Sequence, residues 1–283
     1  MASTEYFVGK QYHIGLSPGE LERYILLCGA PERVAKVAHY FDDGLTRPES
    51  RHREFVTVSG HYKGIPLSVM ATGIGTDNTE IAVIEATQCF AGSAIRPTFI
   101  RIGSCGAIKE GIEVGDLVIS GAALPRENTS SFYLPAGTKV FAHPDILKSL
   151  ESAAQKLAYT FHTGVTCSTS SFYGGQGREA PGFPIRDDAK REILFPELLS
   201  AGVLNFEMET STLFTLAQIS TCAIRAGAVC AVYAARHANQ GFDPGALEEA
   251  EKRCIETGLE TIRILAELDT TQAPTTTDAR ELL

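Results

Sequence analysis

The strongest constraint on the fold is the alternation of short apolar runs with amphipathic runs along the chain. Residues 24–28, 98–102 and 226–234 are apolar runs of strand length. Runs with the apolar spacing of a helix separate them, and the longest covers residues 248–268. Apolar strands interleaved with helices are typical of a sheet that is covered on both faces. The pattern predicts an α/β fold with a central mixed, partly parallel sheet flanked by helices.

Local signals add a hairpin and two helix starts. Lys63-Gly64 separates two runs of strand pattern, as in a β-hairpin. Pro31 suits the first turn of a helix, and Asn78 is expected to cap another. The hairpin strands are expected at residues 55–59 and 65–71, further strands at 116–120, 161–166 and 203–206, and further helices at 144–157 and 207–219.

Neither a linker nor an internal repeat divides the 283 residues. This length is sufficient for one large α/β domain with a sizeable core. We therefore expect a single domain over residues 1–268. Residues 269–283 are rich in Thr and carry few apolar side chains, so we expect them to form a disordered tail.

Composition excludes several classes of partner. The net charge of −9 argues against nucleic acid or an anionic membrane as a partner. The chain has no apolar run of membrane-spanning length, and residues 1–10 do not have the pattern of a secretory segment. The seven cysteines show neither paired nor zinc-ligand spacing, which is typical of buried thiols in a reducing compartment. We expect a cytoplasmic protein without a zinc site of cysteine and histidine ligands.

Glycine-bearing turns follow several of the expected strands. Ligands of α/β proteins bind beyond the carboxyl ends of the strands, where glycine lets backbone N–H groups approach an anion. A dinucleotide fingerprint does not fit, because Asn78 stands where the third glycine after Gly73 and Gly75 would be. Each turn taken alone is more often a simple reversal of the chain than a ligand site. The turns contain Gly29, Gly73 and Gly75, Gly103 and Gly106, and Gly174, Gly175 and Gly177.

Three arginines have informative positions, and two of them, Arg33 and Arg101, lie beside these turns. Arg33 is in the first turn of a helix, where the helix dipole disfavours a cation. Arg101 lies in an apolar strand, where a charge needs a partner or a ligand. Arg53 is part of a basic run, and forked guanidinium groups suit phosphate oxygens. The alternatives are a buried ion pair for Arg101 and a solvated surface position for Arg53.

Two glutamates lie at an expected strand-to-helix junction. Glu207 and Glu209 are two residues apart, so their side chains point in different directions, and one of them is expected to dominate a ligand contact. A carboxylate that accepts from two vicinal hydroxyls is a good clamp for a ribose. The alternative is that both are ordinary acidic residues of a first helical turn.

Taken together, these segments resemble the nucleoside phosphorylase superfamily, and within it the enzymes that act on uridine. The resemblance covers about residues 12–268, and each motif is short, but their joint order is specific. The motifs are His13-Ile14-Gly15-Leu16, Gly29-x-Pro31-x-Arg33-Val34, His52-Arg53-Glu54-Phe55, Thr72-Gly73-Ile74-Gly75, Arg101-Ile102-Gly103-x-x-Gly106, Phe172-Tyr173-x-Gly175-Gln176-x-Arg178 and Glu207-Met208-Glu209.

The resemblance implies reversible phosphorolysis of uridine to uracil and ribose 1-phosphate, with inorganic phosphate as cosubstrate and without a required cofactor. Catalytic roles would belong to Arg101, Glu209, Gln176 and Arg178. Phosphate would be held by Gly29, Arg33, Arg53, Arg101 and Ser104, the ribose by His13, Glu207, Met208 and Glu209, and the base by Phe172, Gln176, Arg178 and Arg236.

The resemblance also implies a shared active site. Arg53 and His13 would reach the site of a neighbouring subunit, so the active unit would be a homodimer or an assembly of dimers. Glu54, Ile74 and Asn78 match positions that can hold a cation at that interface, although the residue matching Asn78 is usually Ser.

The identity of the nucleoside depends on the base site. A Gln amide offers a donor and an acceptor side by side, which match a uracil carbonyl and its N3–H. The run 234–237 contains no acidic residue of the kind that purine-specific relatives use. The alternatives are another nucleoside, purine or thymidine, or a hydrolytic nucleosidase. Departures from the family pattern are Ala30, Cys105, Ala235 and the stretch 177–184.

Overall fold

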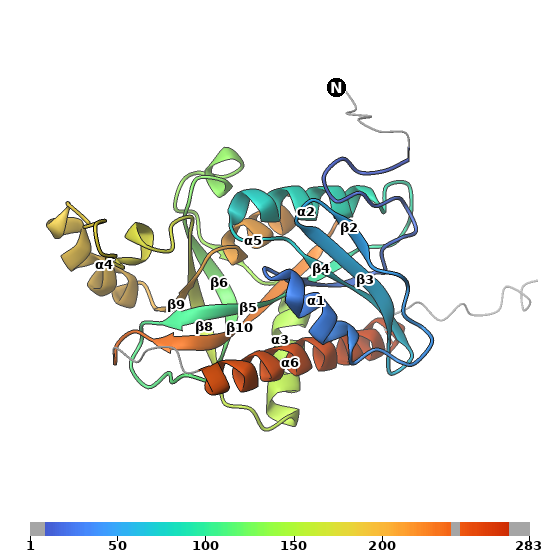
Figure 1. The fold of residues 1–283 in the computed structure, drawn as a ribbon. Coiled ribbons are helices and arrows are strands. Elements are labelled where there is room, and N and C mark those ends of the chain that lie inside the picture. The colour runs from blue at the N-terminus through green and yellow to red at the C-terminus, as the bar shows by residue number, and fades with distance from the viewer. Residues whose placement is uncertain (1–8, 239–243, 272–283) are drawn as a thin grey trace, which may run out of the picture.

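The computed structural model describes residues 9–238 and 244–271, with the side chains of residues 190 and 191 left out. Figure 1 shows a central sheet with helices on both sides. The strands are β1 Tyr24–Cys28, β2 Ser50–His52, β3 Phe55–Tyr62, β4 Ile65–Ala71, β5 Thr98–Ala107, β6 Leu117–Arg126, β7 Val140–Phe141, β8 Phe161–Thr169, β9 Val203–Glu207 and β10 Arg225–Ala235. The helices are α1 Pro31–Ala38, α2 Thr76–Gln88, α3 Pro144–Lys156, α4 Asp188–Ser200, α5 Thr210–Ile219 and α6 Pro244–Thr271, with short 3₁₀ turns at Ser130–Phe132 and Gly174–Gln176.

The sheet is mixed and closes on itself. Its strand order is β10-β6-β8-β9-β5-β1-β4-β3-β2, and β10 also pairs with β5. Strand β1 is parallel to β4 and β5, whereas β5 is antiparallel to β9. The predicted mixed α/β sheet is confirmed, but the pairing of β10 with β5 closes part of it into a ring of strands. Such closure removes two free edges that would otherwise need cover.

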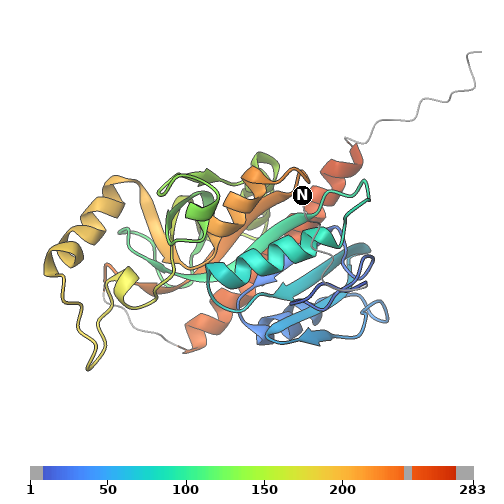
Figure 2. The same cartoon turned by 90° about the horizontal axis from the view of Figure 1, so that it is seen from above.

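Helices cover the two faces of this sheet. On one face, α1, α3 and α6 pack through Val34, Ile146 and Leu259 against strand residues such as Leu26. Helices α2 and α5 lie on the other face (Figure 2). They contribute residues to a second apolar cluster. The first cluster contains Tyr24, Leu26 and Cys28 of β1, and the second contains Ile25 and Leu27. Alternate residues of β1 therefore point to opposite faces, and the strand is buried on both.

The starts of α2 and α5 differ from the sequence-based expectation, and α6 begins at Pro244 rather than at residue 248. Helix α2 begins at Thr76 with Gly75 as its N-cap, so the predicted cap at Asn78 is wrong. Gly75 has φ 101°, a conformation that is open to glycine, and this allows the helix to begin three residues earlier. Helix α5 begins at Thr210 rather than at Glu207, because β9 continues through Glu207.

The last helix ends later than expected. Helix α6 runs to Thr271, three residues beyond the predicted boundary. Asp269 accepts two hydrogen bonds from Arg225 and one from Tyr24, which joins the end of the helix to the start of two strands. Residues 272–283, the rest of the predicted tail, lie outside the described residues. Within residues 9–238 and 244–271, no helix is both long and apolar enough to cross a membrane.

Candidate active site

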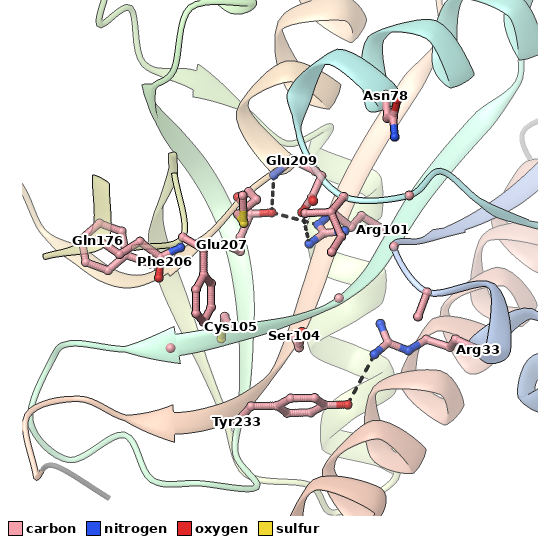
Figure 3. Close-up of a pocket in the computed structure, with 18 of the residues that line it drawn as sticks. Arg33, Asn78, Arg101, Ser104, Cys105, Gln176, Phe206, Glu207, Glu209 and Tyr233 are labelled. Atoms are coloured by element: carbon pink, nitrogen blue, oxygen red, sulfur yellow. Dashed lines mark hydrogen bonds and ion pairs between the residues drawn. The ribbon is translucent and has the colours of Figure 1, made fainter. Parts of the chain in front are cut away.

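A cavity of about 760 Å³ opens where β1, β4, β9 and β10 end and where β5 carries its glycines. Figure 3 shows the side chains that line it. A ligand site beyond the carboxyl ends of strands was the sequence-based expectation. Of the predicted site residues, the cavity is lined by Gly29, Arg33, Arg101, Ser104, Phe172, Gln176, Arg178, Glu207, Met208 and Glu209.

Arg101 joins the two glutamates at the centre of the cavity. Its Nε lies 2.9 Å from a carboxylate oxygen of Glu207, and its Nη2 lies 2.5 Å from one of Glu209. The backbone makes room for this guanidinium at Gly103, where a Cβ would lie 2.7 Å from Arg101 Nη2 and 2.9 Å from the sulfur of Cys230. The buried ion pair was the alternative interpretation of Arg101, and the structure shows it in a cavity that is also open to a ligand.

Both carboxylate oxygens of Glu207 accept hydrogen bonds from other groups of the protein. It accepts from Arg101 Nε, from the hydroxyl of Ser168, and from the backbone N–H groups of Glu209 and Thr210 at 2.9 Å. These last bonds satisfy N–H groups at the start of α5, as a capping side chain does. Glu207 therefore orients its neighbours.

Glu209 has fewer protein partners. It accepts a hydrogen bond from the N–H of Gly75 at 2.7 Å, in addition to its ion pair with Arg101. Burial raises the pKa of Glu209, and the negative charge of Glu207 adds to this rise while Arg101 opposes it. Burial also disfavours the charge on Arg101, but its pKa is raised overall because both carboxylates outweigh the loss of water. Of the two glutamates, Glu209 has more acceptor capacity to offer a ligand.

A second buried arginine stands on the other side of the cavity. Arg33 Nε lies 2.6 Å from a carboxylate oxygen of Glu251 on α6, and its Nη1 donates to the carbonyl of Ile102 at 3.0 Å. Its Nη2 donates to the hydroxyl of Tyr233 at 3.3 Å. The sequence pattern does not single out Glu251 or Tyr233, because Glu251 is one of many charges on a long helix and Tyr233 lies within an apolar strand.

The far end of the cavity carries Gln176, Arg178 and Phe172. Arg178 stacks on the ring of Phe172, with its Cζ 4.5 Å from the ring centroid. Gln176 is buried and points its amide toward Arg178, whose Nε lies 3.4 Å from the amide oxygen. Burial lowers the pKa of Arg178.

Arg236 supports this end without lining the cavity. It donates to the backbone carbonyl of Gln176, and its Cζ lies 4.9 Å from the ring centroid of Phe195. Burial, with a smaller effect of the neighbouring Arg178, lowers its pKa to about 10. The contact holds the backbone of Gln176 in place. Arg236 therefore supports the cavity wall and does not line the cavity itself.

Arg53 and His13 do not line the cavity of their own chain. The guanidinium of Arg53 lies over the ring of Tyr12, 4.9 Å from its centroid. His13 is held by Glu85 of α2, which accepts from its backbone N–H at 2.8 Å and contacts Nδ1 at 2.6 Å. Neither side chain therefore has a contact with the chain's own pocket, although Glu54, the neighbour of Arg53, lines it.

Glu54, Ile74 and Asn78 lie together at the rim of the same cavity. They surround Gly73, where a Cβ would lie 2.6 Å from the amide nitrogen of Asn78 and 3.6 Å from Cγ of Glu54. Among the described residues, no group of three or more His, Cys, Asp or Glu side chains could hold a metal ion. A cation at Glu54, Ile74 and Asn78 stays a prediction that rests on one carboxylate and neutral oxygens.

Comparison with known proteins agrees with this architecture. The model of the phosphorylase superfamily matches residues 23–267. The uridine phosphorylase of Thermococcus kodakarensis is 44% identical over 261 residues, which are 92% of this chain and 88% of that protein. The uridine phosphorylase of Escherichia coli K12 is 33% identical over 256 residues, 90% of this chain and 97% of that protein.

A solved structure shows the same fold. The Trypanosoma brucei nucleoside phosphorylase, which shows uridine phosphorylase activity, matches with a TM-score of 0.79 and 28% identity, covering 90% of this chain and 97% of that one. Similarity over nearly the whole length, in sequence and in fold, means that the chain belongs to the phosphorylase superfamily.

Proposed function

We propose that this protein catalyses the reversible phosphorolysis of uridine to uracil and ribose 1-phosphate. The observation that carries the proposal is the arrangement of one cavity: Arg33 at one side, the Arg101–Glu209 pair at the centre, and the Gln176–Arg178 pair at the far end. An anion site, a hydroxyl acceptor and a site for a polar base then follow one another, as the parts of a nucleoside and phosphate would. The uridine phosphorylases among the relatives support the choice of nucleoside.

Phosphate binds on the side of Arg33 and Ser104 in this proposal. The buried guanidinium groups of Arg33 and Arg101 supply charge-assisted donors, and Gly29 allows the backbone to approach. Phosphate serves as the nucleophile, so the protein supplies no covalent nucleophile and requires no cofactor. Holding phosphate and nucleoside together contributes up to roughly 7–11 kcal/mol in the ideal case.

The ribose binds over Met208, with its vicinal hydroxyls donating to the Glu209 carboxylate. Breaking the glycosidic bond leaves positive charge on the sugar and negative charge on the departing base. The Glu209 carboxylate, close to the sugar, favours the first of these charges. Glu207 acts indirectly, because its oxygens already accept from Arg101 and from the backbone at the start of α5.

The uracil binds at Gln176 and Arg178 and packs on Phe172. Donors from these two side chains stabilise the anionic leaving base, an effect of roughly 3–4 kcal/mol for each well-placed donor. Arg236 holds the backbone of Gln176 and so keeps the amide in position. A site that pairs a polar edge rejects bases that lack the matching groups.

The working unit in this proposal is a homodimer or an assembly of dimers, in which Arg53 and His13 complete the site of a neighbouring subunit. Glu54, Ile74 and Asn78 would hold a cation at that contact. The reaction serves pyrimidine nucleoside salvage and catabolism. A cytoplasmic location agrees with seven free cysteines, six of them buried.

Release of uracil from uridine, with and without inorganic phosphate, tests the proposal. We expect release to require phosphate and to produce ribose 1-phosphate in equal amount. Inosine and thymidine, assayed in parallel, should react more slowly than uridine. Equal release with and without phosphate would identify a hydrolase instead, and a preference for inosine would refute the assignment of the base site.

A further inference from the structure

Tyr233 lies at an irregularity in β10, directly beside the cavity. Val232 pairs with Cys105 and Ala234 pairs with Gly106 of β5, so Tyr233 is the extra residue between two consecutive pairs. A bulge of this kind re-aims a side chain and occurs often beside active sites. Here it places a large polar aromatic residue in a strand whose other residues, apart from Arg225 at its start, are small or apolar.

The two ends of the Tyr233 side chain have different surroundings. The ring packs against the apolar cluster beneath α1 and α6, whereas the residue as a whole is only partly buried and lines the cavity. Figure 3 shows the hydroxyl beside the guanidinium of Arg33, with Ser104 on the neighbouring strand. The ring is therefore anchored and the hydroxyl faces the anion side of the site.

The hydrogen bond to Arg33 determines which way the hydroxyl proton can point. Arg33 Nη2 donates to the Tyr233 oxygen, so that oxygen accepts and its own proton remains available. Among the described residues the hydroxyl has no acceptor. Burial raises the pKa of Tyr233 to about 12, so the group is a neutral donor at physiological pH.

We propose that the Tyr233 hydroxyl is a direct ligand of the phosphate, donating to an oxygen that Arg33 also contacts. This inference rests on the proposed function and adds a residue to its phosphate site. Arg33 uses three N–H groups on Glu251, Ile102 and Tyr233, and a guanidinium has five, so two remain for the anion. The remaining Nη2 proton and the hydroxyl proton come from atoms 3.3 Å apart, a separation that suits donation to one phosphate group.

Tyr233→Phe removes the donor and keeps the ring. We expect the KM for phosphate to rise about tenfold, as for the loss of one hydrogen bond to a charged group, and the KM for uridine to stay within about twofold. Tyr40→Phe is the matched control, because Tyr40 also carries a partly buried ring and donates to Glu256 of α6 outside the cavity. We expect its two KM values to match those of the wild type.

If Tyr233 acted only by positioning Arg33, Tyr233→Phe would also raise the KM for phosphate. The substitution must therefore also be made in a protein in which Arg33 has been replaced. In an Arg33→Lys protein, Tyr233→Phe should still raise the KM for phosphate about as much as in the wild type. If the effect disappears there, the hydroxyl acts by orienting Arg33 and the direct contact is refuted. An unchanged phosphate KM for Tyr233→Phe alone would refute the inference while leaving phosphorolysis intact.

Phosphate binding without turnover separates this inference from the proposed function. Phosphate should raise the melting temperature of the wild type, and the rise should be smaller for Tyr233→Phe and full for Tyr40→Phe. If the wild type binds phosphate in this way but releases no uracil, the proposed reaction fails and the ligand assignment survives. An equal shift in the wild type and in Tyr233→Phe would refute the ligand assignment.

Discussion

At the scale of single residues, the site depends on how two neighbouring carboxylates divide their partners. Glu207 is bonded to the backbone at the start of α5, to Ser168 and to Arg101. Glu209 has the N–H of Gly75 and one nitrogen of Arg101. The spacing in the sequence makes the two side chains unequal, and their contacts make Glu209 the better acceptor for ribose hydroxyls.

The raised pKa of Glu209 predicts the acid side of the pH profile. Because burial favours the neutral carboxyl, Glu209 gains its proton at a higher pH than an ordinary Glu, whose pKa is about 4.3. The neutral form is a weaker acceptor, so kcat/KM for uridine should fall on acidification while an ordinary Glu is still ionised. The measurement is kcat/KM against pH.

Two variants make this assignment specific. Glu209→Gln should lower kcat/KM by roughly 10²–10⁴-fold, as for two lost charge-assisted bonds, and should remove the acid limb. Glu110→Gln, at an exposed position, should leave the profile unchanged. An acid limb that persists in Glu209→Gln would assign the titration to another group.

At the scale of elements, α2 holds the N-terminal segment that carries His13. Glu85 accepts from the backbone N–H groups of His13 and Ile14 and contacts Nδ1 of the His13 ring. His52 Nδ1 lies 2.7 Å from the carbonyl of His13 and adds a contact from the end of β2. The carboxylate assigns the proton to Nδ1, which leaves Nε2 as an acceptor for an outside donor.

The family resemblance assigns the ribose 5′-hydroxyl of the neighbouring site to His13. Glu85→Gln should therefore weaken binding of this hydroxyl, although Glu85 itself does not contact the substrate. We expect kcat/KM for uridine to fall about five- to tenfold, because a misoriented ring loses one neutral hydrogen bond. The value for 5′-deoxyuridine, which lacks the hydroxyl, should stay unchanged.

The control is Glu80→Gln, because Glu80 lies on the same helix and accepts from Tyr133. Its kcat/KM should match the wild type for both substrates. If Glu85→Gln slowed both substrates equally, Glu85 would have a general structural role and the orientation of His13 would not be its function.

At the scale of the whole molecule, two predicted ligands do not line the cavity of their own chain. Arg53 is stacked on Tyr12 and His13 is bound to Glu85, and neither lines the pocket. A site that takes both residues from a second copy would be incomplete in a monomer. Closed two-fold symmetry would complete both sites of a dimer at once.

Mixing two impaired variants tests this sharing. Arg53→Ala damages the neighbour's site, and Glu209→Gln damages the chain's own site, so one site of a mixed dimer is intact. Random exchange should restore up to about a quarter of wild-type activity, since half of the dimers are mixed and each has one good site. The measurement is uracil release after the two proteins have exchanged subunits.

Arg51→Ala supplies the comparison for Arg53→Ala, because Arg51 is a neighbouring exposed arginine that pairs with Glu49. It should be active by itself. Recovery must also be absent when each damaged variant is mixed with itself. If tagged subunits demonstrably exchange and activity stays at the sum of the two variants, each site is built from one chain.

The elements that the sequence predicted are those that local rules determine. Apolar runs such as the one that became β1, the Lys63-Gly64 turn and Pro31 at the start of α1 depend on neighbouring residues, so period and turn chemistry sufficed. The start of α2 was misplaced because a glycine with positive φ capped the helix where Asn78 also fitted the pattern. The charges at strand ends were visible because a cation such as Arg101 is unusual in an apolar strand.

By itself, the sequence determined the class of fold, the strand ends that carry glycine, and the residues whose charge demands a partner. Only the tertiary structure decided which partners they meet: Arg101 with Glu207, more than 100 positions apart, and Arg33 with Tyr233, 200 positions apart. It also decided that β10 pairs with β5 through a bulge that turns Tyr233 toward the cavity. The physical reason is that propensity and periodicity act over a few residues, whereas a binding site is made by contacts whose geometry depends on how distant strands pair.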